Sequence, residues 1–326
     1  MNGVRIGIVG AGFIGNMHAQ LLAEIPRAAV TAIYDTQLDR AQALARKVEA
    51  EAASSLTALL ERVDAVYITA PNRTHPDIAL AALDRGCHVF CEKPMAVSLE
   101  AARAMLEASE QSDRVFQVGH NRRFAPVYRK VKELINTDRF RPHSAHIKMN
   151  RGELLDPPWV GQPDVTGGFL YETTIHMLDM VRWLFGDVTS VMVAGSAHEY
   201  GEVDDFSMLL TFASGMHATL ASSADASWFF PFERIEIFAH HATIETQEMV
   251  GVTYTEGLDS RLTTFSFHHL SREDQWGYRS EDEAFIRSIL DGAPVTVSTW
   301  DGYKAVELVE ACYRSLRTGE RIPLDV

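Results

Sequence analysis

The stretch Val4–Gly15 reads V-R-I-G-I-V-G-A-G-F-I-G, an apolar run of strand length that leads into a Gly-x-Gly-x-x-Gly loop. In such a loop Gly10 permits the tight turn, Gly12 lets the backbone approach a pyrophosphate, and Gly15 lets the next helix pack against the strand. The amino end of that helix offers unpaired N–H groups to the phosphate charge. The stretch therefore predicts the start of a dinucleotide-binding domain.

The context of the glycines matters, because an ordinary strand–turn–helix also needs glycine. Here the expected helix Phe13–Leu22 follows the loop, and a second apolar strand, Val30–Tyr34, ends at Asp35. A carboxylate there accepts hydrogen bonds from the adenosine ribose and repels the extra phosphate of NADP. Because Thr36 and Gln37 provide no arginine for that phosphate, we predict NAD as the cofactor. Capping of the next helix is a compatible role for Asp35.

Composition and charge narrow the class of protein. The 326 residues are 46% hydrophobic, enough for two modest cores, and no apolar run reaches membrane-spanning length. The first strand begins at Val4, so we expect no leader peptide and a cytoplasmic protein. The net charge of −14 argues against nucleic acid and anionic membranes as partners. Cys87, Cys91 and Cys312 lack metal-ligand spacing, so we expect buried thiols and no metal.

The first third of the chain alternates apolar runs with helical stretches, which predicts a doubly wound parallel sheet of α/β class. Further strands are expected at 65–69, 88–91 and 115–119, and helices at 37–48, 76–85 and 99–111. We place this Rossmann domain at residues 1–121. Ligands of such sheets bind beyond the carboxyl ends of the strands.

The remaining residues, 122–326, predict an α+β domain with a large, open, mainly antiparallel sheet, because its strands follow one another directly. Strands are expected at 144–150, 188–194, 206–212, 216–222, 234–238 and 242–246, helices at 126–136, 172–185, 280–291 and 300–318, and a Pro/Gly-rich loop at 155–168.

Two loops at strand ends carry candidate cofactor contacts. The first, Ala70–Pro76, places Pro71, Asn72 and His75 at a strand mouth, although Thr74 and His75 also suit the start of a helix. The second is Glu92-Lys93-Pro94, where a lysine beside the nicotinamide can take the proton of a hydroxyl group that loses hydride. A surface Glu–Lys pair is an equally good interpretation from spacing alone. The predicted cofactor contacts are Gly10, Gly12, Phe13, Ile14, Gly15, Asp35, Pro71, Asn72, His75, Glu92 and Lys93.

The helix expected at 172–185 is apolar around much of its circumference, which is typical of a buried helix. Glu172, His176 and Asp179 are spaced to share one of its faces, and Gly167-Gly168 precede it. We interpret His176 as an acid/base group whose tautomer Glu172 or Asp179 sets. A structural histidine is the alternative, and the two carboxylates on its face weigh against it.

These motifs resemble the glucose-fructose oxidoreductase, inositol 2-dehydrogenase and rhizopine-catabolism family (Gfo/Idh/MocA), from one end of the chain to the other. The residues that carry the likeness are the glycine loop with Asp35, Pro71-Asn72-Arg73-Thr74-His75, Glu92-Lys93-Pro94, Gly119-His120-Asn121-Arg122-Arg123-Phe124, and Gly167-Gly168 ahead of His176 and Asp179.

The resemblance implies catalytic Lys93 and His176, a substrate bound between the domains, and dimers or tetramers formed through the open sheet. It also implies that Asn121 and Arg122 face the substrate, with weaker support for Asn150 and Arg151, while Trp159 and Trp228 suit stacking on a sugar or a place in the core. Inositol dehydrogenases usually carry Asp four residues before the histidine, where this chain has Glu172.

We therefore expect an NAD-dependent oxidoreductase that acts on a secondary alcohol of a cyclitol, sugar or sugar-derived polyol, with Lys93, His176 and Glu172 as catalytic residues. An NAD-dependent glycosidase of the same family is one alternative. A non-catalytic sensor of NAD or sugar is another, although it has no need of Lys93 or of ionisable groups on a buried helix.

Overall fold

The computed structural model describes residues 3–137, 140–150, 162–198, 201–224, 226, 232–258 and 261–325. Contacts divide the chain into two compact units. Unit 1 comprises residues 1–120 and 278–306, and unit 2 comprises residues 121–277 and 307–326. From the sequence we expected a single boundary after residue 121, which placed residues 278–306 in the second domain. Their contacts join them to unit 1 instead.

Unit 1 is built on a six-stranded parallel sheet with the order β3-β2-β1-β4-β5-β6, which is the strand order of a Rossmann fold. The strands are β1 (Val4–Val9), β2 (Ala28–Tyr34), β3 (Glu51–Ala52), β4 (Ala65–Ile68), β5 (His88–Glu92) and β6 (Phe116–Gly119). The fold class expected from the sequence is therefore confirmed for this unit. The short β3 lacks the apolar alternation that marks a strand, and it was not predicted.

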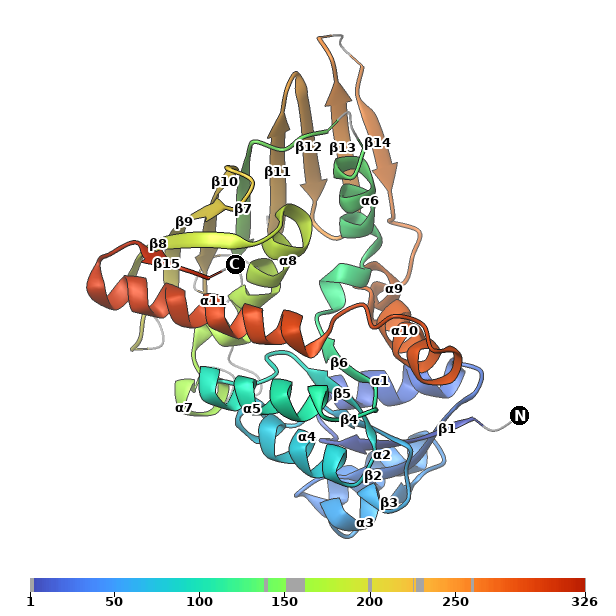
Figure 1. The fold of residues 1–326 in the computed structure, drawn as a ribbon. Coiled ribbons are helices and arrows are strands. Elements are labelled where there is room, and N and C mark those ends of the chain that lie inside the picture. The colour runs from blue at the N-terminus through green and yellow to red at the C-terminus, as the bar shows by residue number, and fades with distance from the viewer. Residues whose placement is uncertain are drawn as a thin grey trace. The chain divides into compact units, whose positions relative to one another are not determined.

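Helices cover the sheet of unit 1. They are α1 (Phe13–Glu24), α2 (Leu38–Lys47), α3 (Leu56–Leu60), α4 (His75–Asp84), α5 (Leu99–Glu110) and α10 (Tyr278–Asp291). Helix α10 packs beside α1, and α4 packs beside α5 (Figure 1). Phe285 and Ile286 of α10 join the apolar core that lies under α1 and α2, so a late segment of the chain completes the nucleotide-binding unit.

Unit 2 is built on a nine-stranded sheet with the order β14-β13-β12-β11-β7-β10-β9-β8-β15. The strands are β7 (Ser144–Asn150), β8 (Val188–Ser196), β9 (Asp205–Phe212), β10 (His217–Ser223), β11 (Glu233–Ala239), β12 (Ala242–Gln247), β13 (Gly251–Glu256), β14 (Thr263–Ser266) and β15 (Ile322–Pro323). Every pairing in it is antiparallel except that of β7 with β10. The predicted open, mainly antiparallel sheet is thus confirmed; β13, β14 and β15 were not predicted.

Several helices lie wholly within unit 2. They are α6 (Pro126–Ile135), α7 (Pro163–Thr166), α8 (Ile175–Phe185) and α9 (Arg272–Gln275). Helix α6 contacts β12 and β13 (Figure 1). The last helix, α11 (Thr299–Thr318), contains the boundary between the units, after Val306.

Two local expectations for unit 2 were wrong. The stretch expected as a loop at 155–168 contains the short helix α7. The α-helix expected from Glu172 begins only at Ile175, because Leu170–Thr174 form a π-helical turn. No helix among the described residues is long and apolar enough to cross a membrane; the cytoplasmic location stays a prediction.

Candidate active site

The three glycines of the loop between β1 and α1 have different physical reasons to be glycine. Gly10 has φ of +100°, and a Cβ there would lie 2.7 Å from the backbone N of Ala70. A Cβ on Gly15 would lie 2.0 Å from the carbonyl oxygen of Gly10. A Cβ on Gly12 would meet nothing within 4 Å. The protein itself excludes a side chain at the first and third glycines, whereas the open side of Gly12 fits the approach of a pyrophosphate.

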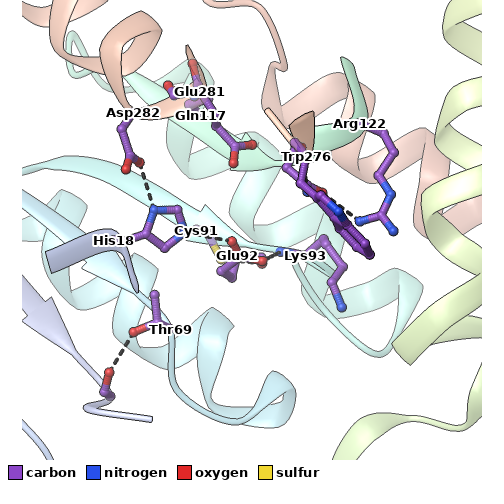
Figure 2. A network of polar contacts seen from close by, with 12 residues as sticks. His18, Thr69, Cys91, Glu92, Lys93, Gln117, Arg122, Trp276, Glu281 and Asp282 are labelled. Carbon is purple, nitrogen blue, oxygen red and sulfur yellow. Dashed lines mark hydrogen bonds and ion pairs between the residues drawn. The ribbon is translucent and has the colours of Figure 1, made fainter. Parts of the chain in front are cut away.

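Thr69, after β4, holds this loop in place. Its Oγ1 donates to the carbonyl oxygen of Gly10 at 2.7 Å (Figure 2). The role of Thr69 was not predicted, because a threonine after a strand carries no signal in the sequence until the sheet places β4 beside β1.

Asp35 ties the end of β2 to the same loop. One carboxylate oxygen accepts the N–H of Ala11 at 2.8 Å, and the other accepts the N–H of Gln37 at 2.8 Å. The cap position of α2 is Gln37, with no side-chain capping bond, so Asp35 does not cap that helix. Each carboxylate oxygen has a second lone pair, and these fit the ribose hydroxyls of NAD.

The histidine of the loop after β4, His75, contacts backbone carbonyl groups through both ring nitrogens. His75 is buried, with Nδ1 2.8 Å from the carbonyl oxygen of Pro94 and Nε2 2.8 Å from that of Ala70. Burial lowers the pKa of His75, and a neutral ring carries one N–H for these two carbonyls. Asn72 is buried and Pro71 is exposed at the start of the same loop. The geometry gives His75 the role of joining two loops.

Phe13 and Ile14 begin α1 beside Gly12. Phe13 is 75% exposed and Ile14 is partly buried. An exposed aromatic ring at the amino end of the helix is available to a ligand in the loop, and the cofactor contacts of Phe13 and Ile14 stay predictions.

Lys93 follows directly after β5 and is partly exposed. Its N–H donates to Oε2 of Glu92 at 3.2 Å, and its bond to Pro94 is cis. Glu92 is 8% exposed, and its Oε1 accepts from the buried His18. The alternative of a surface Glu–Lys pair therefore fails, because Glu92 belongs to the interior. Lys93 stands at the carboxyl edge of the parallel sheet, the edge that carries the glycine loop.

The described residues hold one cluster of metal-ligand type: His18, Glu92 and Glu281 place ligand atoms within 4.8 Å of one another. His18 contacts a carboxylate through each ring nitrogen. A ring that donates through both nitrogens has no lone pair for a metal ion, so His18 forms a hydrogen-bonded chain with Asp282 and Glu92.

In unit 2, the short helix Asn121–Phe124 carries the buried Arg122. The Arg122 guanidinium donates to Glu233 at 3.0 Å and to Oδ1 of Asn121 at 3.2 Å, and it lies 4.6 Å from the ring centre of Trp276. Its Nη1 is also 3.5 Å from Nε2 of His176. The structure thus brings together three predicted substrate residues, Asn121, Arg122 and His176, with Glu233 and Trp276 as partners that the sequence analysis missed.

Asp179 has a different partner from the one expected. Both of its oxygens accept from Arg123, at 2.9 Å and 2.6 Å, in a buried bidentate pair. A bidentate pair of this kind fixes α8 against the helix that carries Arg122. Spacing along one helix cannot reveal this pair with Arg123. The orienting role of Asp179 toward His176 stays a prediction.

Glu172 lies in the π-helical turn ahead of His176 and is partly exposed. The turn is anchored at Gly168, whose φ is +102° and whose Cβ would lie 2.5 Å from the hydroxyl of Tyr313. That hydroxyl accepts the N–H of Leu170 at 3.2 Å. Single π-helical turns of this kind occur often at functional sites. The irregular backbone therefore agrees with the functional role predicted for Glu172.

The other predicted substrate residues lie at or beyond the end of β7. Asn150, its last residue, is buried, and its N–H donates to the carbonyl oxygen of Phe232 at 2.7 Å. Arg151, Trp159 and Trp228 lie outside the described residues.

Comparison with known families agrees with this geometry over most of the chain. Residues 4–120 match the oxidoreductase family with an NAD-binding Rossmann fold, and residues 128–245 match the GFO/IDH/MocA C-terminal domain. The chain belongs to the GFO/IDH/MocA oxidoreductase family. Its unit 1 is accordingly an NAD-binding Rossmann domain.

Relatives within the GFO/IDH/MocA family match the chain at full length. The myo-inositol 2-dehydrogenase of Thermotoga maritima is 30% identical, over 99% of this chain and 99% of that protein. The crystal structure of a putative myo-inositol dehydrogenase from Sinorhizobium meliloti 1021 is 27% identical with a TM-score of 0.85, covering 99% of this chain and 100% of that one.

The same fold also serves another substrate class. The UDP-N-acetylglucosamine 3-dehydrogenase from Acidithiobacillus ferrooxidans has a TM-score of 0.84 at 24% identity, covering 97% of this chain and 98% of that one. At that identity the likeness concerns the fold alone.

Proposed function

We propose that the chain is an NAD-dependent dehydrogenase that oxidises a secondary alcohol of a cyclitol, sugar or sugar-derived polyol, in the manner of an inositol 2-dehydrogenase. The observation that carries the proposal is Lys93, which follows β5 at the same edge of the sheet as the glycine loop. The full-length likeness to a myo-inositol 2-dehydrogenase supports the choice of substrate class.

The cofactor's contribution is a nicotinamide ring that accepts hydride from the carbinol carbon. In this proposal the Nζ atom of Lys93 takes the hydroxyl proton as the hydride leaves, so that the oxygen becomes a carbonyl oxygen. His176 serves as acid/base or proton relay, and Glu172 orients His176 or a substrate hydroxyl. Without a group to take the proton, hydride loss would leave a protonated carbonyl, which is a high-energy product.

The substrate contacts in this proposal are Asn121, Arg122, Asn150, Arg151 and Trp159. Arg122 is held by Glu233, Asn121 and Trp276, so its orientation is established without the substrate. A preorganised donor of this kind suits a polyol, because it loses little conformational freedom when a hydroxyl binds.

Glu172 bears on which polyol is used. Compared with the aspartate that inositol dehydrogenases usually carry, Glu172 keeps the charge and adds about one methylene of reach. We therefore propose a substrate hydroxyl set differently from that of myo-inositol, while the reaction class stays the same.

The proposal extends to a homodimer or homotetramer. The open face of the nine-stranded sheet supports it, because Met192 on β8 is 45% exposed and pairs in register with Leu209 on β9. Burial of such apolar side chains favours association.

The proposal is tested by NADH formation against a panel of inositols, aldoses, alditols, glycosides and sugar acids, with NADP in parallel. Net NADH on one alcohol class is the expected result. Cleavage of a glycoside without net NADH would replace the dehydrogenase with an NAD-dependent glycosidase. Tight NAD binding with no turnover of any compound would favour a sensor.

Replacement of Lys93 by methionine tests the assigned role of the amine. Lys93→Met keeps a long apolar side chain and removes the proton acceptor, so we expect turnover to be abolished while NAD binding changes by less than about three-fold. The measurements are kcat and the dissociation constant of NAD. Loss of NAD binding with normal turnover per bound cofactor would show that Lys93 holds the cofactor instead.

A further inference from the structure

A buried chain of charged side chains lies beside the β5 end that carries Lys93. His18 on α1 is fully buried. Its Nδ1 lies 2.8 Å from Oδ1 of Asp282 on α10, and its Nε2 lies 3.1 Å from Oε1 of Glu92 (Figure 2). None of the catalytic steps proposed above uses His18 or Asp282.

The geometry sets the protonation of the His18 ring. An ionised carboxylate only accepts hydrogen bonds, so each of the two ring nitrogens carries a proton and the ring is an imidazolium. Burial opposes this charge, yet Asp282 and Glu92 raise the pKa of His18 well above its usual value. Although burial opposes its charge, contact with His18 lowers the pKa of Glu92, whereas burial raises the pKa of Asp282.

Aromatic rings enclose this imidazolium. Its ring centre lies 5.4 Å from that of Tyr67, 5.1 Å from that of Phe90 and 5.9 Å from that of Tyr278. Exclusion of water strengthens both ion pairs and leaves no solvent to replace a lost partner. The orientation of the Glu92 carboxylate consequently depends on His18.

Glu92 passes this constraint to Lys93. While Oε1 of Glu92 accepts from His18, its Oε2 accepts the N–H of Lys93 at 3.2 Å. A Cβ on Gly119 would lie 3.0 Å from Oε1 of Glu92, so the glycine in β6 makes room for the carboxylate in this position. On the other side of Lys93, the carbonyl oxygen of Pro94 contacts His75 at 2.8 Å.

We propose that His18 and Asp282 are positioning residues: together they hold the Glu92 carboxylate, which sets the backbone and hence the amine of Lys93. This inference rests on the proposed role of Lys93 and goes beyond it, because it assigns a function to a helix pair, α1 and α10, remote in sequence from that lysine. Helix α10 comes from the late segment that returns to unit 1.

The test uses His18→Gln and Asp282→Asn in the full-length protein. For His18→Gln we expect kcat to fall by about 10- to 100-fold, since misplacement of a reacting group by about 1 Å costs that much. Asp282→Asn keeps an acceptor for Nδ1, so we expect a fall of about 3- to 10-fold. In both variants the NAD dissociation constant stays within about three-fold, because the glycine loop and Asp35 are untouched.

A second readout does not depend on turnover. The reaction of Lys93 with formaldehyde and borohydride, followed by peptide mass spectrometry, should become about three-fold faster or more in His18→Gln as the loop is released. The exposed Lys47 on α2 serves as an internal reference. We expect faster labelling of Lys93 in Asp282→Asn as well. This variant therefore tests the proposal even if His18→Gln does not fold.

Phe285→Leu is the matched control. Phe285 packs on Tyr67 and Phe90 within the same cluster, so this variant lowers the melting temperature without breaking the ion pairs. Its kcat and Lys93 labelling should equal those of the wild type. If His18→Gln and Asp282→Asn also change only the melting temperature, the positioning role is refuted. If the wild type turns over no alcohol while the labelling of Lys93 still responds to His18, the proposed function fails and the positioning role stands.

Discussion

Asp35 shows how one side chain combines a structural and a selective role. It accepts the N–H groups of Ala11 and Gln37, so it shapes the glycine loop before any cofactor binds. The same negative charge opposes the extra phosphate of NADP.

The Asp35→Asn variant separates these two roles. The amide oxygen keeps one acceptor for the loop, while the charge is lost, so we expect the ratio of NADP to NAD affinity to rise by about 10-fold. Fluorescence titration with both cofactors measures the ratio. Asp39→Asn, an exposed neighbour in the first turn of α2, is the control and should leave the ratio unchanged. An unaltered ratio in Asp35→Asn would remove this residue from cofactor selection.

The environment of His88 predicts that the folding stability of the protein depends on pH. Its Nδ1 accepts the N–H of Val115 at 2.9 Å, which requires an unprotonated nitrogen. Partial burial and the nearby Arg114 lower the pKa of His88. The unfolded chain therefore binds more protons than the folded one just below pH 6.5, and stability falls as the pH falls through that value.

Replacement of His88 by glutamine should weaken this dependence, since the amide oxygen accepts the same N–H without titrating. We expect the drop in melting temperature between about pH 7.5 and 5.5 to be smaller in His88→Gln than in the wild type. Calorimetry at several pH values measures the drop. His143→Gln, at an exposed position in unit 2, is the comparison; equal drops in all three proteins would contradict the assignment.

At the scale of the element, two glycines of the segment β1–loop–α1 are expected to serve different purposes: Gly15 the folding of the segment, and Gly12 the binding of NAD. A Cβ on Gly12 meets no protein atom within 4 Å, whereas one on Gly15 meets the carbonyl oxygen of Gly10 at 2.0 Å. The two alanine variants should therefore fail in different ways.

We expect Gly12→Ala to fold normally and to bind NAD at least about 10-fold more weakly, because the methyl group occupies the approach of the pyrophosphate. Gly15→Ala should lose about 3 kcal/mol of folding free energy, since the helix must move away from the strand. Urea unfolding and NAD titration of both variants provide the measurements. Tight NAD binding by Gly12→Ala would mean that the pyrophosphate does not lie over this glycine.

The elements that the sequence predicted share one property: their signals are local. The strand ending at Val9, the helix after it and the strands of unit 2 up to Gln247 lie within about two residues of their expected bounds. The two-residue strands β3 and β15 exist only because a neighbouring strand supplies their hydrogen bonds. The π-helical turn at Leu170–Thr174 likewise depends on Gly168 and Tyr313, which are far apart in sequence.

At the scale of the whole molecule, the proposed homo-oligomer can be tested at the open face of the nine-stranded sheet. Met192→Lys combined with Leu209→Lys adds two charges to paired apolar positions, so we expect a homo-oligomer to shift toward monomer. Light scattering coupled to size-exclusion chromatography measures the mass. Glu110→Lys, at an exposed position on α5 of unit 1, is the control. A wild-type monomer would contradict the proposed assembly.

The sequence by itself determined the class of unit 1, the glycine loop, Asp35, and the lysine at the end of β5, because each depends on residues near one another in the chain. Only the tertiary structure decided that residues 278–306 belong to unit 1, that Asp179 pairs with Arg123, and that His18 joins Asp282 to Glu92. These arrangements bring together buried charges from distant segments, and a buried charge acquires its role from the partner that compensates it.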